Sequence, residues 1–336
     1  MIRFPAEWEP QKRVWLAWPH NAVNWGERPL IFAFYETLIG IIRRFQPVAL
    51  IVPPDTALSF PSASDDRSRH PIECIPMPTD DIWIRDYGPI FVDDAGKKAV
   101  AAFRFNAWGA KFPPWDRDDR VPLQIARKYG IPMAAHDVVF EGGAIDVNGR
   151  GVGITTLPCL VGPNRQPPMS RQTVEETLRS ALGLTSMLVL PEGLCGDHTD
   201  GHVDNVARFL SEDHVVVARE DDTNADNHPI LVKAKKAIEA FRPGGRTLKV
   251  SELPLPPTRA VGDEILPASY MNFIFVNGGL IVPTYGTPLD DVALDFFRSV
   301  FPEREVVGID CTLVIEEGGS LHCLSKQEPL LPGEHP

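Results

Sequence analysis

Ionisable side chains gather between Gly196 and Phe209, at the start of an apolar run. From His202 onward the pattern predicts a strand, in which alternate side chains share a face, so His202 and Asp204 should lie roughly 7 Å apart along the backbone. A carboxylate can hold a cation while a neighbouring histidine donates or accepts protons. The pair therefore suits proton transfer beside a bound positive group, although an isolated His-x-Asp is more often a solvated turn.

Two carboxylates upstream each stand beside a turn. Asp86 follows Trp83 and precedes Gly88-Pro89, a pattern that a surface turn with a salt bridge also produces. Glu141 ends an apolar run and precedes Gly142-Gly143. Glycines at such a position permit positive φ and a close approach of the backbone to a ligand. Each stretch alone is compatible with a plain tight turn.

A cysteine near the C-terminus could supply a nucleophile. Cys323 follows the glycine turn at Gly318-Gly319. Most single cysteines are buried small hydrophobes, and the thiolate is the form that reacts. The remaining cysteines form no C-x-x-C pair, which argues against a disulfide framework and against a thiolate zinc site. They are Cys74, Cys159, Cys195 and Cys311. Any special cysteine would act as a free thiol.

The composition limits the partners. The 336 residues carry 33 Lys and Arg against 45 Asp and Glu, a net charge of −12 without a basic tract, so a cationic substrate fits better than nucleic acid. Residues 1–9 lack an apolar segment, and no later apolar run approaches the length of a membrane span. We therefore expect a cytoplasmic protein that binds no membrane. The sequence leaves the oligomeric state open, a homo-oligomer included.

Five helices are expected to position these residues, with strands between them. Apolar side chains recur at helical spacing over 30–45, 121–129 and 170–182, and in two segments that follow Pro229 and Pro288. Strands are expected at 48–52 and 99–105. The third helix carries the capping signature Thr173-x-x-Glu176 and should stop at Gly183.

The later part of the chain has the spacing of an internal repeat. The last three helices begin near residues 170, 229 and 289, at intervals of about 60 residues. One unit alone has too small an apolar face to bury, which predicts units packed around a shared axis with the helices outside. Three glycine doublets are expected where strands end, so that loops converge there on a site: Gly142-Gly143, Gly278-Gly279 and Gly318-Gly319.

Taken together, four stretches resemble the agmatine deiminase and bacterial-type peptidylarginine deiminase family in their order and approximate spacing. They are Trp83-x-Arg85-Asp86-x-Gly88-Pro89, Glu141-Gly142-Gly143, Thr199-Asp200-Gly201-His202-Val203-Asp204 and Gly318-Gly319-x-Leu321-His322-Cys323. The resemblance runs from Pro5 to Cys323, and the four-part motif is far more specific than any single piece. It implies one domain over residues 1–336, frayed from about 332, with the α/β-propeller (pentein) fold of five pseudo-repeated ββαβ units around a central site.

The resemblance also implies the chemistry, which is hydrolytic deimination of a guanidinium group through a covalent thiouronium, without metal or cofactor. The family's nucleophile falls on Cys323 and its general acid/base on His202. Asp86 and Asp204 match the carboxylates that bind the guanidinium, and Glu141 matches one that contacts the substrate or the histidine. The expected substrate is agmatine, which gives N-carbamoylputrescine in putrescine and polyamine metabolism; peptidyl-arginine is the alternative.

The substrate's tail needs contacts of its own. Trp83 is expected to flank the aliphatic chain, and Glu7 or Glu9 to meet the distal ammonium. The other expected substrate-binding residues are Arg85, His198 and Gly319. His198 departs from the family, which commonly has an acidic residue there, close to the distal amine. Two further departures, where the family often has Asn, are Ala144 and Ser320.

Two interpretations from other classes remain open. A metallohydrolase could hold zinc or manganese with His198, His202 and the neighbouring carboxylates Asp200 and Asp204, but it leaves Cys323 without a role. An inactive binding module on the same fold is the other, because a fold alone never proves chemistry. The intact set of thiol, imidazole and carboxylates argues against an inactive protein.

Overall fold

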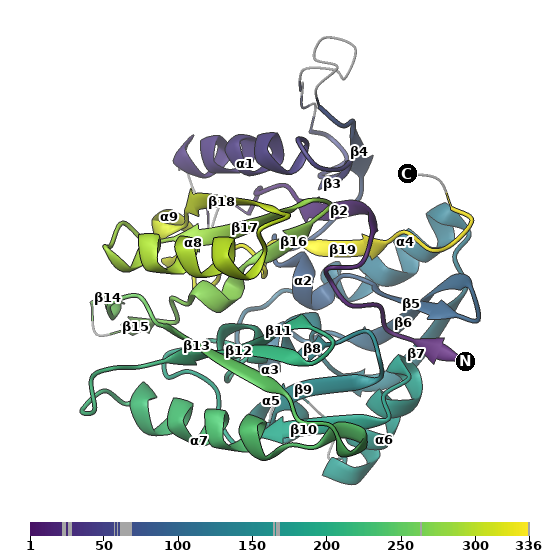
Figure 1. Ribbon diagram of the computed structural model, residues 1–336. Helices are drawn as coiled ribbons and strands as arrows, with labels where there is room; N and C mark the ends of the chain where they lie inside the picture. The colour runs from purple at the N-terminus through teal and green to yellow at the C-terminus, as the bar shows by residue number, and fades with distance from the viewer. Residues whose placement is uncertain are drawn as a thin grey trace.

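One connection pattern recurs in five sheets of the computed structural model, which describes residues 1–21, 25, 29–56, 58, 60, 69–163, 165, 169–262 and 264–334. In each of these sheets an antiparallel strand pair is followed by a helix and then by a strand parallel to the second strand of the pair. Figure 1 shows the longer helices toward the outside of the molecule. The fold is therefore mixed α/β.

Three of the units follow one another in the middle of the chain. The first comprises β5 (Ile90–Asp94), β6 (Lys97–Arg104), α4 (Val121–Tyr129) and β7 (Met133–Val139). The second comprises β8 (Ile145–Val147), β9 (Val152–Thr156), α6 (Arg171–Leu182) and β10 (Ser186–Leu190). The third comprises β11 (Ala207–Ser211), β12 (His214–Arg219), α7 (Asn227–Ala240) and β13 (Lys249–Pro254).

The fifth unit combines the two ends of the chain. The fourth comprises β16 (Ile274–Val276), β17 (Gly279–Thr284), α8 (Leu289–Val300) and β18 (Glu305–Asp310). The fifth comprises β19 (Lys326–Pro329), β2 (Gln11–Ala17), α1 (Pro29–Ile42) and β3 (Val48–Val52). Strand β19 pairs with β2 in the register that sets Lys326 opposite Trp15. The sheet of the fifth unit therefore closes only when both ends of the chain meet.

Shorter elements extend or connect the units. Strand β1 (Ile2–Arg3) pairs with β5, β4 (Ile72–Pro76) pairs with β3, and β14 (Arg259–Val261) forms a hairpin with β15 (Glu264–Leu266). The short helices are α2 (Ile84–Tyr87), α3 (Ala107–Ala110), α5 (Leu157–Val161) and α9 (Thr312–Ile315). The single 3₁₀ turns are η1 (Asp118–Arg120), η2 (Gly142–Ala144), η3 (Val203–Asn205), η4 (Pro243–Gly245) and η5 (Tyr270–Asn272).

The five expected helices are present, with small differences at their ends. Helix α1 ends at Ile42, three residues before the expected end, and α7 begins at Asn227, before the His228-Pro229 pair. The start of α6 is capped by Ser170, whose hydroxyl accepts from the N–H of Thr173, so the capping signature expected at Thr173 was placed three residues too late. Gly183 ends α6 in the left-handed region, as expected.

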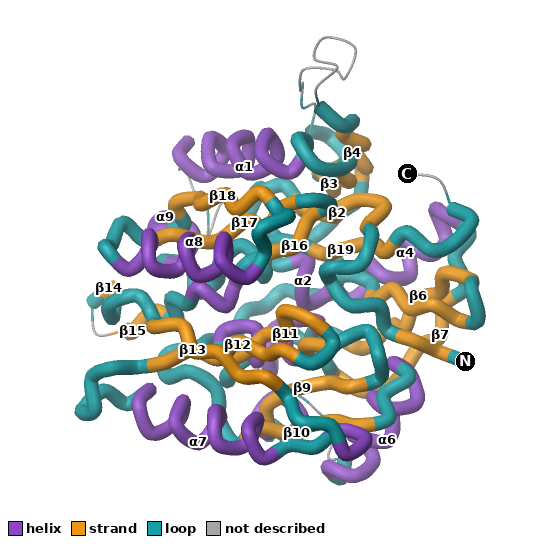
Figure 2. Tube along the Cα trace, in the orientation of Figure 1, coloured by secondary structure: helices purple, strands orange, loops and turns teal. Residues whose placement is uncertain are grey.

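Burial of the strands explains why they form where they do. All five residues of β3 are buried beneath α1, which is why its sequence is an uninterrupted run of apolar residues rather than an alternating one. The main core joins the units, and a smaller one lies under α6. Figure 2 shows the strands gathered between α1 and α7, with the long helices outside them.

The last described residues are tied back to the protein. The carboxylate of Glu334 accepts a hydrogen bond from the N–H of Leu331 and lies 2.9 Å from Nζ of Lys98. Residues 335 and 336 of the expected frayed tail lie outside the described residues. No helix in the described ranges is long and apolar enough to span a membrane. The cytoplasmic location stays a prediction.

Candidate active site

Each of the five units is entered through a short turn, and these turns contact one another. The turns are α2 before β5, η2 before β8, η3 before β11, η5 before β16, and residues 321–324 before β19. Contacts join α2 to η2, η2 to η3, and η3 to η5. Hydrogen bonds from the N–H of His322 to Oδ1 of Asn272, and from the N–H of Arg85 to the carbonyl of Cys323, close the ring of turns.

His202 lies at this ring, fully buried between two carboxylates. Its Nδ1 lies 3.7 Å from Oδ1 of Asp86, and its Nε2 lies 3.9 Å from Oε2 of Glu141. These distances are too long for hydrogen bonds, and neither ring nitrogen has a hydrogen-bond partner within the described residues. Burial alone would lower the pKa of His202, but the surrounding carboxylates outweigh it and raise the pKa to about 9. The ring is therefore an imidazolium at neutral pH.

The expected strand at His202 was wrong. Residues 203–205 form the turn η3, and β11 begins only at Ala207. His202 is the residue before the turn, so its side chain and that of Asp204 are not related by strand alternation. Both nevertheless reach the same point, because a Cβ added to Gly143 would lie 2.6 Å from Nδ1 of His202 and 2.9 Å from Oδ2 of Asp204.

Asp86 and Asp204 are both buried, and each keeps a different set of partners. Asp86 accepts from Nε1 of Trp108 at 3.0 Å and from the N–H of Gly143 at 2.9 Å. Burial raises the pKa of Asp86 above its ordinary value. Asp204 accepts from Nδ1 of His322 at 2.6 Å through Oδ2, while its buried Oδ1 has no partner in the described part of the chain. Burial works to raise the pKa of Asp204, but the hydrogen bond from His322 and the nearby cationic groups together outweigh it and lower the pKa.

Glu141 is held by an arginine that also fixes the loop before His202. Nε of Arg165 lies 2.9 Å from Oε1 of Glu141, and its other nitrogens bind the carbonyl of Thr199 and the carboxylate of Asp200. Arg165 and Glu141 are both fully buried. Burial alone would raise the pKa of Glu141, but the guanidinium outweighs it and lowers the pKa to about 2. Glu141 is therefore a fixed negative charge beside His202.

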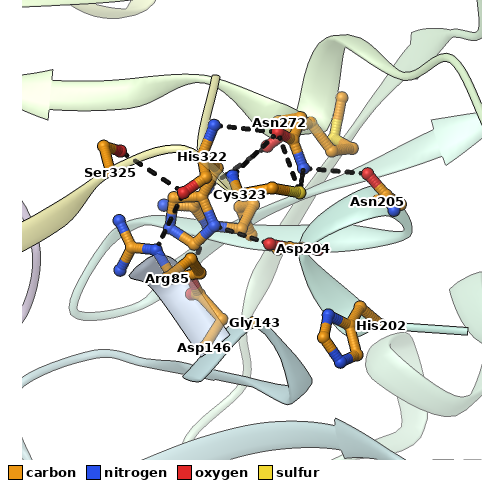
Figure 3. Close-up of polar contacts among 12 residues, drawn as sticks. Arg85, Gly143, Asp146, His202, Asp204, Asn205, Asn272, His322, Cys323 and Ser325 are labelled. Carbon is orange, nitrogen blue, oxygen red and sulfur yellow. Dashed lines mark hydrogen bonds and ion pairs between the residues drawn. The ribbon is translucent and has the colours of Figure 1, made fainter. Parts of the chain in front are cut away.

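Cys323 stands at the end of the ring, oriented by an asparagine (Figure 3). Nδ2 of Asn272 lies 3.4 Å from the sulfur of Cys323 and 2.9 Å from Oδ1 of Asn205. Oδ1 of Asn272 accepts from the N–H of Cys323 at 3.3 Å. Burial raises the pKa of the Cys323 thiol well above its ordinary value, and the charges of Asp204 and Asp86 raise it further. The thiol is therefore protonated unless a cation offsets the carboxylates.

A cavity of about 200 Å³ leads from the surface to Cys323 and Asp86. Its wall includes the rings of Trp83, Trp108 and Phe112, together with His198 and Gly319. A Cβ added to Gly319 would lie 2.3 Å from the indole of Trp83, so only glycine permits this contact. The carboxylates that line the cavity are Asp81, Asp86, Glu264, Glu316 and Glu317, and no lysine or arginine lines it within the described residues. The cavity therefore favours a cation.

A strained turn places Trp108 in this wall. Ala107, Trp108, Gly109 and Ala110 all have positive φ, between 51° and 94°. Each non-glycine residue in this left-handed region costs on the order of 1 kcal/mol. Trp108 donates to Asp86 from this turn and packs edge-on against Phe105. The hydrogen bond to Asp86 and the contact with Phe105 offset this strain.

Two expected substrate contacts, Glu7 and Glu9, do not reach the cavity. Glu9 lies 2.7 Å from Arg3 and accepts from the N–H of Ala6, so it is held in the N-terminal segment. Glu7 is buried beneath the site, 2.9 Å from Nη2 of Arg208 and 2.8 Å from Nε2 of His322. Because both carboxylates are fixed by these partners, the prediction that either meets the distal ammonium was wrong.

Arg85 also lies behind the site rather than in the cavity wall. Its Nε donates to the carbonyl of His322 at 3.0 Å, its Nη1 donates to Gln327, and its Nη2 lies 3.6 Å from Glu7. The side chain therefore supports the turn that carries Cys323, and a direct contact with substrate, as first expected, was wrong. By contrast, Trp83, His198 and Gly319 do line the cavity.

The candidate ligands of the metallohydrolase interpretation are committed to other partners. His198 pairs with Glu264, Asp200 pairs with Lys111 and Arg165, and Asp204 binds His322. Over the described ranges, no group of three histidine, cysteine or acidic side chains is arranged to hold a metal ion. The spacing His198-x-x-x-His202 therefore does not produce a shared ligand set.

Sequence reasoning missed three residues of this site: Trp108, Arg165 and Asn272. Asn272 could have been found, because it ends the turn before the fourth unit just as His202-Val203-Asp204 precedes the third. The positions of Trp108 and Arg165 carry no such signal, since both lie in connections within units. They reach the site only through the tertiary fold.

Comparison with known proteins agrees with this geometry. A family model of Porphyromonas-type peptidyl-arginine deiminases matches residues 3–329. The agmatine deiminase of Stutzerimonas stutzeri (strain A1501) is 37% identical, over 97% of this chain and 95% of that protein. The agmatine deiminase of Pseudomonas aeruginosa (strain LESB58) is 36% identical, over 98% and 95%.

Solved structures are similar over the same extent. The C. jejuni agmatine deiminase with substrate bound gives a TM-score of 0.89 at 28% identity, over 98% of this chain and 97% of that one. The agmatine deiminase of Enterococcus faecalis gives 0.88 at 32% identity, over 98% and 96%. A buried thiol beside carboxylates and an imidazolium, on this α/β fold, defines an active site of the cysteine deiminase class. The chain belongs to the Porphyromonas-type peptidyl-arginine deiminase family, which confirms the resemblance predicted from the sequence.

Proposed function

We propose that this enzyme hydrolyses the guanidino group of agmatine to N-carbamoylputrescine and ammonia, through a covalent intermediate on Cys323. The observation that carries the proposal is a buried thiol beside two carboxylates and a charged histidine, at the base of an acidic cavity. Its relatives of 36–37% identity are agmatine deiminases, hydrolases of C–N bonds in a guanidino group. No step of the proposed reaction requires a cofactor.

Asp86 and Asp204 are proposed to bind opposite edges of the guanidinium. A guanidinium presents a planar fork of N–H donors, and carboxylates accept from it in pairs. The unpartnered Oδ1 of Asp204 is an acceptor suited to this role. Fixing the plane of the cation exposes its central carbon to the sulfur of Cys323 from one face.

Binding of the cation is proposed to activate the thiol. Asp86 and Asp204 raise the pKa of Cys323 in the free enzyme, and a guanidinium between them neutralises that effect, so that the thiol releases its proton to solvent. The thiolate then attacks the central carbon and forms a C–S bond, giving a tetrahedral adduct. His202 gives its proton to one nitrogen of the adduct, and the C–N bond breaks to release ammonia.

The second half of the reaction uses the same histidine in the opposite direction. Neutral His202 takes a proton from water, and the resulting hydroxide attacks the carbon of the thiouronium. The C–S bond then breaks, which restores the thiolate, and the hydroxyl proton passes to ammonia or solvent to leave the neutral ureido product. Glu141, fixed by Arg165, supports the imidazolium form that the first half requires.

The mouth of the cavity suits the second charge of agmatine. Trp83 and Trp108 would flank the aliphatic chain. The family commonly has an acidic residue at the position of His198. Here Glu264, on β15, pairs with His198 and supplies an acidic group at the same place from a different element. The ammonium would therefore meet Glu264, with His198 as the partner that orients it. A free α-carboxylate would face this acidic mouth without a cation to receive it.

The arrangement of the units is proposed to be the five-fold α/β-propeller (pentein). Support comes from five sheets with one connection pattern and from the ring of entry turns that closes on itself. Such a ring would bring one turn from each unit to a common centre, which accounts for the origin of the site residues in all five units. Small-angle scattering that fits an open, crescent-like chain better than a closed disc would contradict this arrangement.

The function is tested by ammonia release from agmatine, free arginine and a C-terminal-arginine peptide, side by side at one pH. We expect kcat/KM for agmatine to exceed that for each of the others at least about tenfold, near 1.4 kcal/mol of transition-state binding. A peptide that equals agmatine would assign the enzyme to peptidyl-arginine instead. Failure of all three substrates would refute deimination of these guanidines.

A further inference from the structure

The histidine that precedes the nucleophile is buried beneath the site, and each of its ring nitrogens faces a carboxylate. Nδ1 of His322 lies 2.6 Å from Oδ2 of Asp204, and Nε2 lies 2.8 Å from Oε2 of Glu7. The pKa values of Glu7 and Asp204 are both lowered despite their burial, which makes both groups anions. A carboxylate anion only accepts hydrogen bonds, so the His322 ring is held between two acceptors.

The backbone of His322 is fixed by the same contacts that present the thiol. Its N–H donates to Oδ1 of Asn272 at 2.8 Å, and its carbonyl accepts from Nε of Arg85 at 3.0 Å (Figure 3). Oδ1 of Asn272 also accepts from the N–H of Cys323. The turn that holds the nucleophile therefore also fixes the backbone from which the His322 ring projects.

Glu7 gives the far side of this ring a rigid support. Its Oε1 accepts from the N–H of Phe275 at 2.9 Å, and its Oε2 lies 2.9 Å from Nη2 of Arg208 and 3.6 Å from Nη2 of Arg85. Glu7 is 7% exposed and does not line the cavity. It can therefore act on the substrate only through its partners, of which His322 is the one that hydrogen-bonds to Asp204.

We propose that Glu7 and His322 are a positioning pair that turns the Asp204 carboxylate toward the guanidinium. This inference rests on the proposed function. His322 occupies Oδ2 of Asp204 and leaves Oδ1 as the buried oxygen without a partner in the described part of the chain. A carboxylate bound at one oxygen cannot rotate freely, so the orientation of Oδ1 is set before substrate arrives.

Two amide variants separate the contacts of His322. Glutamine places an amide nitrogen near Nε2, toward Glu7, whereas asparagine places one near Nδ1, toward Asp204. His322→Gln should raise KM for agmatine about 10- to 100-fold with a smaller change in kcat, the loss of one hydrogen bond to a charged group. His322→Asn should raise KM less.

Glu7→Gln tests the support, because its amide oxygen can still accept from the N–H of Phe275. If Glu7 acts through His322, Glu7→Gln should raise KM in the native background but add less than about twofold to His322→Gln. A matched control is His214→Gln, since His214 is also a buried histidine, but it binds Ser251 within a sheet. This control should stay within about twofold of the native KM.

The pair is refuted if His322→Gln, folded by its thermal transition, keeps the native KM for agmatine. Fully additive effects of Glu7→Gln and His322→Gln would also refute it. If His322→Gln does not fold, His322→Asn and Glu7→Gln give the same test. Calorimetric binding of methylguanidine to Cys323→Ala, with and without His322→Gln, tests the pair even if the native enzyme releases no ammonia from agmatine. Weaker binding in the double variant supports the pair, and equal binding refutes it.

Discussion

Gly143 lies where a single methyl group would disturb three site residues at once. A Cβ built at Gly143 lies 2.6 Å from Nδ1 of His202, 2.8 Å from Oδ1 of Asp86 and 2.9 Å from Oδ2 of Asp204. To reach ordinary van der Waals contact near 3.4 Å, the imidazole nitrogen would have to retreat by about 0.8 Å. Misplacement of a reacting group by about 1 Å can cost about 100-fold in rate.

Gly143→Ala should therefore lower kcat/KM for agmatine by about 100-fold, measured by ammonia release. Overpacking of a buried position costs about 1–3 kcal/mol, so the variant should unfold at a somewhat lower urea concentration but remain folded without urea. Gly40→Ala is the matched control, because Gly40 lies inside α1 and, apart from that helix, its built Cβ meets among the described residues only the end of the Arg69 side chain. Activity of Gly143→Ala within about threefold of native would refute the arrangement of the site.

Four further outcomes are expected. Cys323→Ala should bind agmatine without turnover, and mass spectrometry of the acid-quenched native reaction should find the adduct on Cys323; an adduct on another cysteine would contradict its role. The kcat/KM should fall above pH about 9, where His202 loses the proton it gives to ammonia, and a limb that persisted in His202→Asn would exclude this cause. Glu264→Gln should raise KM for agmatine about two- to fivefold, which is the effect of losing an exposed ion pair. The KM for butylguanidine, which lacks the ammonium, should not change. Equal effects on both substrates would show that Glu264 does not bind the ammonium. Dialysis against a chelator should leave the activity intact, and loss with recovery on adding Zn²⁺ would favour the metallohydrolase.

Periodicity predicted the helices well because their apolar faces are local patterns. The expected helix over 121–129 matches α4, and the expected strand over 48–52 matches β3. The expected strand at His202 failed because the two glycines and the aspartates before it favour a turn, in which Gly201 has a φ of 108°. Turn chemistry of this kind competes with the strand pattern over a few residues, and here the turn was formed.

The resemblance to a family predicted the site residues that lie in the family's motifs. Residues that were expected at the cavity because of their charge alone lie elsewhere. Glu7 and Glu9 were expected at the cavity because they are acidic. In the fold each pairs with an arginine, so its carboxylate stabilises the protein away from the cavity. Arg208 and Arg3 provide those partners from distant or unremarkable positions of the sequence. Such pairings depend on tertiary packing, so no pattern along the chain could have predicted them.

The pairing of β19 with β2 has a consequence for protein synthesis. Four of the five entry turns leave the ribosome before residues 321–324, and the sheet that fixes this last turn needs β2, which is made before all of them. The pocket for a guanidinium is thus largely built before the thiol arrives, and an unfinished chain holds no nucleophile near it. Closing a loop of this length carries only a modest extra entropic cost per doubling, so late closure slows maturation more than it weakens the fold. A protease that trimmed either end of the chain would disconnect the same sheet, so catalytic activity reports on the integrity of both ends.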